Sequence, residues 1–180
     1  MALLQRLARL LGAAEPMTNL AAGSIAPNFS LKALDGNEYS LSRAMKHGPV
    51  VVAFFKVSCP VCQFTFPFIE RLFTRHGGGG VTFLGISQDD ASATKRFVED
   101  YGVTFPVLLD ETGYPVSNGY GLTNVPTVFL VDDDGTIRVS CTGFSKPDLE
   151  NIANELATRR KQAPAALFLA NERVPEYKPG

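Results

Sequence analysis

Two cysteines separated by two residues are the feature of this sequence best suited to chemistry. The tetrapeptide Cys59-Pro60-Val61-Cys62 lies between the apolar run of residues 50–55 and an amphipathic segment. This arrangement predicts a strand that delivers both thiols to the first turn of a helix. At a helix start, unpaired N–H groups and the positive end of the helix dipole favour thiolate over thiol.

The spacing of the two cysteines agrees with this interpretation. Pro60 is expected to be the first helical residue, where its missing N–H does no harm. Cys59 would then stand just outside the helix, and Cys62 would lie one turn inside. An offset of three residues makes two helical side chains neighbours, close enough to form a disulfide. The motif therefore predicts thiol–disulfide exchange, in which Cys59 attacks and Cys62 resolves the mixed disulfide.

Closely spaced cysteines can also bind zinc, but a structural zinc site needs about four ligands. His47, His76 and Cys141 provide no second pair at close spacing, so we expect no metal. Cys141 alternates with polar neighbours and shares its face with Val139 and Ile137. We therefore predict that Cys141 is a buried apolar residue of a strand.

Size and composition are those of an ordinary globular protein. The chain has 180 residues, of which 45% are hydrophobic and 19% charged, and its net charge is -1. This charge balance gives no reason to expect binding to nucleic acid. No apolar stretch approaches the roughly 20 residues that a membrane-spanning helix needs. We expect one main domain that is a monomer and does not span a membrane.

Three segments are predicted along the chain: an amphipathic leader over residues 1–22, a folded domain over 23–162, and a tail over 163–180. A secretory signal needs an uninterrupted apolar run of about 7–15 residues. In the leader this run is interrupted by Gln5, Arg6 and Arg9. The interruption favours a cytoplasmic location, with a periplasmic one as the alternative. In the tail, residues 167–169 are apolar, and we expect them to pack on the domain or on a partner.

The hydrophobic pattern predicts the elements of the domain. A hairpin is expected over residues 29–41; strands over 50–55, 81–87, 105–109, 125–131 and 136–142; and helices over 60–76, 92–101, 116–120 and 146–161. Pro67 should bend the first of these helices. Alternating strands and helices followed by a late hairpin indicate an α/β fold, whose central mixed sheet is covered by helices on both faces.

Several short motifs occur in an order that resembles a known family. They are Ala26-Pro27-Asn28-Phe29, the CxxC motif, Phe66-Pro67, Phe105-Pro106-Val107 and Val125-Pro126-Thr127. From about residue 23 to 156, the chain resembles the thioredoxin-fold redoxins of the AhpC/TSA superfamily. It is most similar to the thiol–disulfide oxidoreductases of the TlpA/ResA type.

The resemblance implies a thioredoxin-like fold with an N-terminal β-hairpin, and exchange with protein disulfides without a cofactor. It also implies a further redox partner that reduces or oxidises the dithiol. Cys59, Cys62 and Pro126 would form the catalytic site, with a cis peptide bond before Pro126 that faces the cysteines. Pro60, Lys56 and Thr127 would support the site.

The sequence departs from this family where a proton-shuttling carboxylate would stand. One position of this acid is Ala53 and the other is Thr65. The proton of Cys62 must therefore pass to water or to another group, for which Lys56 and Glu70 are the nearest candidates. Thiol exchange needs a thiolate and a good leaving thiol rather than a dedicated base, so activity is still expected.

The same fold also occurs in peroxiredoxins and in copper-binding proteins of the Sco type, which are the alternative functions. A peroxiredoxin would need threonine or serine three residues before its peroxidatic cysteine, and that position is Lys56. A copper-binding protein of the Sco type would use CxxxC and a distant histidine, whereas this chain has CxxC. Insulin reduction, peroxide consumption and copper content distinguish these alternatives from thiol–disulfide exchange.

Overall fold

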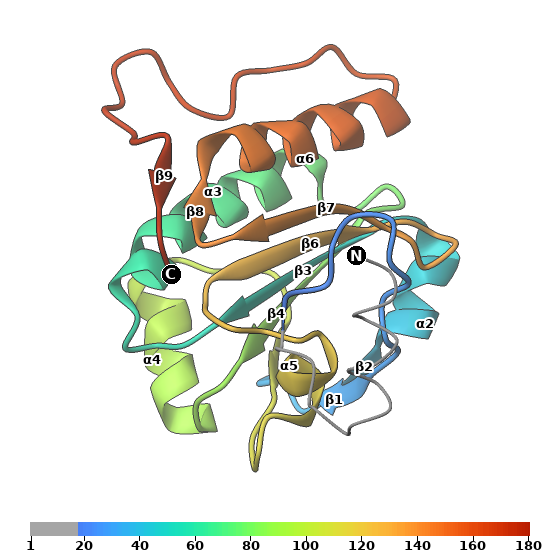
Figure 1. Ribbon diagram of the computed structural model, residues 1–180, viewed down its shortest axis with the longest axis vertical. Helices are drawn as coiled ribbons and strands as arrows, with labels where there is room; N and C mark the ends of the chain where they lie inside the picture. Colours follow the sequence, from blue (N-terminus) through green and yellow to red (C-terminus); the bar gives the residue numbers. More distant parts are fainter. Residues whose placement is uncertain (1–17) are drawn as a thin grey trace, which may run out of the picture.

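A five-stranded mixed sheet with the strand order β5-β4-β3-β6-β7 runs through the middle of the molecule (Figure 1). The computed structural model describes residues 18–180. The strands of this sheet are β3 (Val50–Phe55), β4 (Thr82–Ser87), β5 (Val107–Leu109), β6 (Thr127–Val131) and β7 (Ile137–Thr142). β3 pairs parallel with β4 and antiparallel with β6, so the central strand is hydrogen-bonded on both edges.

The central strand β3 is buried along its whole length because both faces of the sheet are covered. Successive side chains of a strand point to opposite faces. Val51, Ala53 and Phe55 accordingly belong to one hydrophobic core. Val50, Val52 and Phe54 belong to the other. The continuous apolar run in the sequence is thus explained by two cores, one on each side of the sheet.

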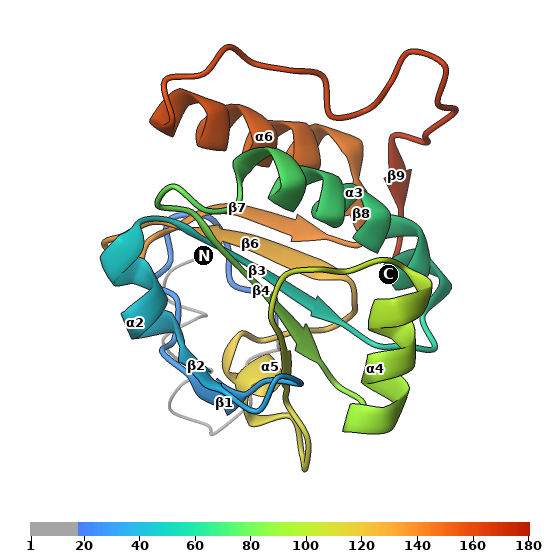
Figure 2. The same ribbon diagram turned by 180° about the vertical axis from the view of Figure 1, so that it is seen from behind.

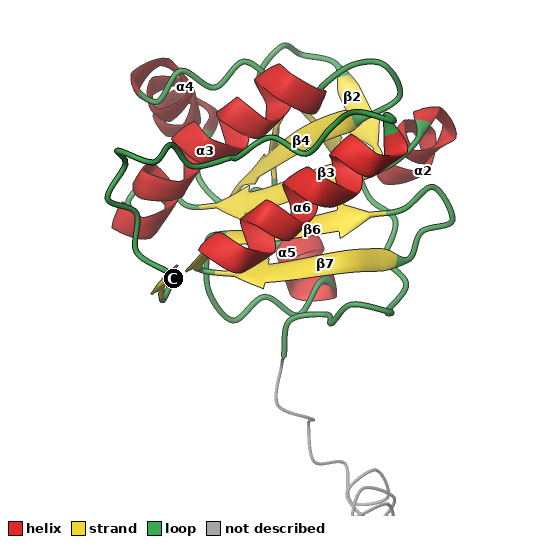
Figure 3. Cartoon of the chain, turned by 90° about the horizontal axis from the view of Figure 1, so that it is seen from above, coloured by secondary structure: helices red, strands yellow, loops and turns green. Residues whose placement is uncertain are grey.

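Helices α3 (Pro60–His76) and α6 (Lys146–Arg159) lie side by side over one face of the sheet (Figure 3). Helix α4 (Ala91–Asp100) joins the same core through Phe97. The opposite face carries α5 (Pro115–Gly119) and the hairpin of β1 (Ser30–Lys32) and β2 (Glu38–Ser40), as the view from behind also shows (Figure 2). The predicted mixed sheet, its two covered faces and the N-terminal hairpin are therefore confirmed.

Four short elements were not predicted from the sequence. They are α2 (Leu41–Ala44), the 3-10 turn η1 (Met45–His47), β8 (Phe144–Ser145) and β9 (Tyr177–Lys178). Elements of two to four residues carry no periodic signal, so packing and pairing with distant segments decide them. Helix α3 continues through Pro67 to His76, and a bend at this proline stays a prediction.

The tail packs on the domain, in part as expected. Leu167 and Phe168 are buried against the domain, whereas Leu169 is half-exposed, and packing of this third residue on a partner stays a prediction. Cys141 is fully buried, as predicted. Most of the leader, residues 1–17, lies outside the described residues, and the segment boundaries stay predictions. Between Thr18 and Gly180, no helix is long and apolar enough to cross a membrane.

Candidate active site

The CxxC motif begins helix α3, and Cys59 is its N-cap. Pro60 occupies the first turn, as predicted. The Sγ atom of Cys59 accepts a hydrogen bond from the backbone N–H of Cys62 at 3.2 Å. The first N–H groups of a helix have no partner within it, so a sulfur at the N-cap satisfies one of them. The local sequence thereby places the first sulfur in the electropositive environment of the helix start.

The two thiols differ sharply in their surroundings. Cys59 is half-buried, whereas Cys62 is fully buried, and both are free thiols. Burial raises the pKa of the Cys62 thiol far above its usual value, while a backbone hydrogen bond from Lys56 acts in the opposite direction. Because the thiolate is the nucleophile, the partly accessible Cys59 is the sulfur placed to react first with an external disulfide.

The loop before β6 lies directly against the dithiol. The Val125–Pro126 peptide bond is cis, as the resemblance implied. The Cys59 thiol donates a hydrogen bond to the Val125 carbonyl oxygen at 3.3 Å. The hydroxyl of buried Thr127 donates to the Asn124 carbonyl oxygen at 2.8 Å and fastens the turn. The residue before Pro126 thus contacts Cys59, whereas the roles of Pro126 and Thr127 in catalysis stay predictions.

Glu70, the carboxylate predicted as a candidate acceptor for the proton of Cys62, does not reach this buried thiol. Both carboxylate oxygens of Glu70 accept hydrogen bonds from Thr104, one from its backbone N–H and one from its hydroxyl. Glu70 follows Cys62 by eight residues, which corresponds to about 12 Å along a helix. The backbone carbonyl of Lys56 accepts from the N–H of Cys59 at 3.1 Å. Lys56 thus belongs to the turn that presents the motif, whereas Glu70 is held elsewhere.

The two positions where the family carries an acid are filled by residues of the core. Ala53 is 1% exposed and Thr65 is 0% exposed. The Thr65 hydroxyl donates to the Val61 carbonyl oxygen at 2.6 Å, within its own helix. Each position is therefore dry and lacks a carboxylate that could accept a proton from Cys62.

Asp89 is a residue of the site that the sequence analysis missed. Its carboxylate accepts a hydrogen bond from the N–H of Val57 at 2.7 Å, and Gln63 donates to the carbonyl oxygen of Val57 at 2.9 Å. These bonds hold the segment between β3 and the motif from both sides. After burial, the negative charge of Asp89 is one of the smaller causes that raise the pKa of Cys62. Since β3 and β4 are parallel, residues that follow them meet at one edge of the sheet, and this signal could have found Asp89.

Selective alkylation tests the asymmetry between the thiols. Iodoacetamide is expected to label one cysteine of the native protein, Cys59, because Cys62 and Cys141 are fully buried and burial raises the pKa of Cys141 to about 12. Mass spectrometry of the labelled protein checks this, with the protein in concentrated urea, where all three cysteines should react, as the control. Rapid labelling of Cys62 in the native protein would contradict the assignment.

Comparisons with known proteins agree with this geometry. The chain matches the AhpC/TSA family over residues 22–140. The chain belongs to this family. It is 33% identical over 135 residues to the thiol–disulfide oxidoreductase ResA of Geobacillus kaustophilus, an alignment that covers 74% of this chain and 76% of that relative. The family resemblance expected from the motifs is therefore confirmed.

Solved structures of other thiol–disulfide proteins show the same fold. The thioredoxin domain of a thiol–disulfide oxidoreductase from Bacteroides vulgatus is 27% identical, with a TM-score of 0.66, over 76% of this chain and 97% of that one. A thiol:disulfide interchange protein from Chlorobium tepidum is 26% identical, with a TM-score of 0.63, over 76% of this chain and 98% of that one. The AhpC/TSA chain thus has the thioredoxin-like fold that its sequence predicted.

Proposed function

We propose that this protein is a thiol–disulfide oxidoreductase that exchanges electrons with protein disulfides through Cys59 and Cys62. The observation that carries the proposal is the partly accessible Cys59 at the start of α3, with the buried Cys62 one turn inside the same helix. The family membership and the names of the relatives support it.

The exchange proceeds in two steps. The Cys59 thiolate attacks one sulfur of a substrate disulfide, forms a mixed disulfide, and releases the other substrate sulfur as a thiolate. Cys62 then loses its proton to solvent and attacks the Cys59 sulfur. This second step closes the Cys59–Cys62 disulfide and releases the remaining substrate sulfur, so that the substrate gains the two electrons that the dithiol loses.

Groups around the CxxC motif stabilise charge on Cys59 and hold the motif in place during these two steps. The N–H of Cys62 lies 3.2 Å from the Cys59 sulfur and stabilises negative charge on it, whether the sulfur is the attacking or the leaving group. Asp89 and Gln63 fix Val57, and through it the segment that presents the motif. No bound cofactor takes part in this mechanism, because both electrons reside on the two sulfurs.

The partners follow from the chemistry. A second thiol or disulfide protein must restore the dithiol after each turnover, and the relative reduction potentials set the direction of electron flow. The monomeric state stays a prediction that size-exclusion chromatography would check. The cytoplasmic location, with the periplasm as its alternative, also stays a prediction, and cell fractionation would decide between them.

Insulin-disulfide reduction compared with peroxide consumption tests this function. With dithiothreitol as reductant, the protein should accelerate insulin reduction well above the reductant alone, and Cys59→Ser should abolish the acceleration. Cys141→Ser is the matched control and should leave the rate of insulin reduction nearly unchanged, since Cys141 is buried in the core and takes no part in the exchange. Peroxide consumption faster than insulin reduction would favour the peroxiredoxin alternative, for which Lys56 stands in an unsuitable position.

A further inference from the structure

Residues 164–180, here called the C-terminal strap, cross the outer side of the α3–α6 layer and end beside the candidate active site (Figures 1 and 2). Near its end, β9 pairs antiparallel with β8, with Lys178 opposite Phe144 and Tyr177 opposite Ser145. The N–H of Lys146 donates to the Glu176 carbonyl oxygen at 2.9 Å and extends this pairing. The strap is thus attached by backbone hydrogen bonds at the end nearest the cysteines.

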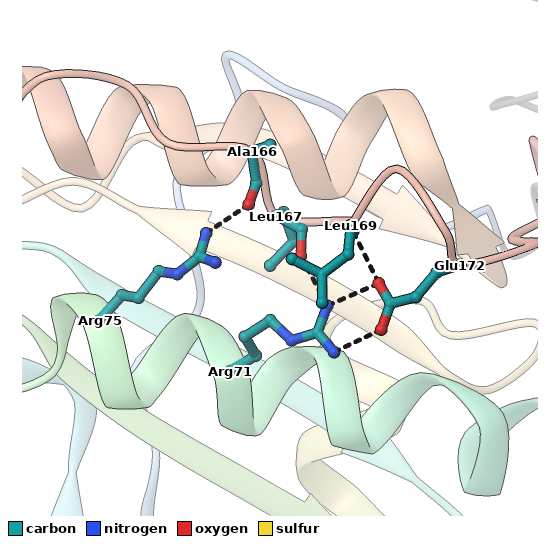
Figure 4. Close-up of polar contacts among 6 residues, drawn as sticks. All are labelled: Arg71, Arg75, Ala166, Leu167, Leu169 and Glu172. Atoms are coloured by element: carbon teal, nitrogen blue, oxygen red, sulfur yellow. Dashed lines mark hydrogen bonds and ion pairs between the residues drawn. The ribbon is translucent and has the colours of Figure 1, made fainter.

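Two arginines one turn apart on α3 hold the middle of the strap (Figure 4). The guanidinium of Arg71 binds both carboxylate oxygens of Glu172, at 2.6 and 2.8 Å, and also donates to the Leu167 carbonyl oxygen at 2.8 Å. Arg75 donates to the Ala166 carbonyl oxygen at 2.7 Å. A bidentate pair between guanidinium and carboxylate is directional as well as strong, so it fixes the path of the strap along the helix that begins with Cys59.

Apolar contacts anchor the strap at two further points. The ring of Phe168 is buried and lies 4.9 Å from that of Phe68 and 5.9 Å from that of Phe144, measured between centroids. Closer to the motif, the Lys178 Nζ atom lies 4.6 Å from the ring centroid of Phe64. Because Phe64 follows Cys62 by two residues, this cation–π contact reaches the first turns of α3.

The last residues of the strap lie against the loop that contacts Cys59. A Cβ atom placed on Gly180 would come within 2.3 Å of the Val125 carbonyl oxygen, the oxygen that accepts from the Cys59 thiol. A Cβ atom placed on Gly143 would come within 2.4 Å of the Lys178 carbonyl oxygen. Backbone therefore packs on backbone here, and residues 178–180 lie on the surface next to the partly accessible Cys59 thiol.

We propose that residues 177–180 occupy the surface on which an extended segment of the substrate binds, so that the strap must leave before a protein disulfide reaches Cys59. This inference rests on the proposed function. An extended peptide can replace β9 because a strand edge recognises the backbone of its partner rather than its side chains. The substrate that this surface fits is a protein with an extended segment next to its disulfide. Folded substrates that lack such a segment would not displace the strap and would not reach Cys59.

The end of the strap can detach while its middle stays bound to the domain. β9 has only two residues and Tyr177 is largely exposed, so releasing this end breaks the short pairing with β8, the Lys178–Phe64 contact and the backbone packing of residues 178–180 but exposes no buried aromatic ring. The Arg71–Glu172 pair and buried Phe168 keep the remainder attached. A tethered segment competes at a high effective concentration, which makes even a weakly bound strand an effective competitor of substrate.

A variant that lacks residues 177–180 tests the proposal, together with Glu172→Gln, which weakens the pair with Arg71 far from the cysteines. Glu99→Gln is the matched control, because it makes the same change at an exposed position of α4. The second-order rate constant for insulin reduction should rise about fivefold or more on deletion, a size usual for coupled sites, less in Glu172→Gln, and not in the control. An unchanged or lower rate on deletion would overturn the proposal.

Alkylation of Cys59 by iodoacetamide provides a readout that does not depend on disulfide exchange. The rate of alkylation should rise in the deletion variant, because the strap no longer covers the surface beside the Cys59 thiol. If no variant reduced insulin, the proposed exchange activity would fail. Faster alkylation on deletion would then still support the strap as a cover of Cys59, and unchanged alkylation would overturn it.

Discussion

Replacing Cys62 with serine is expected to trap the protein in mixed disulfides with its substrates and to lower steady-state reduction about a thousandfold or more. Well-oriented intramolecular reactions proceed as if the reactant were present at roughly 10⁵–10⁸ M, which no external thiol can match. Cys62 lies one turn from Cys59 in the same helix and cannot be reached by solvent thiols. Its removal therefore leaves the first step intact and nearly stops the second.

Non-reducing electrophoresis and peptide mass spectrometry check this prediction. Covalent partners should be attached to Cys59 in Cys62→Ser and should disappear on reduction. Cys59→Ser should form none, and Cys141→Ser should behave as the unmodified protein. Partners that accumulated on Cys62 in the Cys59→Ser variant would reverse the assigned roles of the two thiols.

Replacing Phe66 with alanine is expected to lower the free energy of unfolding by about 3–5 kcal/mol, the usual loss when a buried phenylalanine is truncated. Phe66 is fully buried in α3. Its ring centroid lies 4.4 Å from that of Phe55, 5.2 Å from that of Phe97 and 6.3 Å from that of Phe105. The loss combines the apolar surface removed from the core with the cavity left among these rings.

Urea unfolding followed by circular dichroism measures this effect as a lower midpoint at an unchanged slope. Phe73→Ala is the matched control, because Phe73 belongs to the same helix but is only partly buried. Phe73→Ala should lower the free energy of unfolding clearly less than Phe66→Ala. Equal losses in the two variants would show that burial of Phe66 does not determine the stability of this core. Below the unfolding transition, Phe66→Ala should retain exchange activity per folded molecule, since Phe66 lies in the core rather than at the motif.

The sequence alone predicted the parts of the site that depend on neighbours along the chain. Cys59 as the helix N-cap and Pro60 in the first turn follow from local preferences of the backbone. The buried strand β3 follows from an apolar run that only a sheet covered on both faces can accommodate. The cis bond before Pro126 came from the family resemblance, and the structure confirms it.

Contacts between distant segments needed the tertiary structure. The sequence offered Glu70 as a neighbour of Cys62, yet the structure ties Glu70 to Thr104 and places Asp89 at the strand ends instead. Nothing in the local pattern distinguishes these carboxylates, because either would be stable on a solvated surface. Their roles depend on which strands pair in parallel.

For the C-terminal strap, too, the sequence predicted one part and the tertiary structure was needed for the rest. The apolar residues 167–169 indicated that the tail packs somewhere, and the sequence could go no further. Pairing of Tyr177 and Lys178 with β8, and the bond from Arg71 to Glu172, join residues from 32 to 101 positions apart. Local sequence determined the dithiol and the helix that carries it, because backbone propensities act over a few residues. Only the packed fold decided what surrounds the dithiol, because hydrogen bonding and burial between remote segments are set when the whole core assembles.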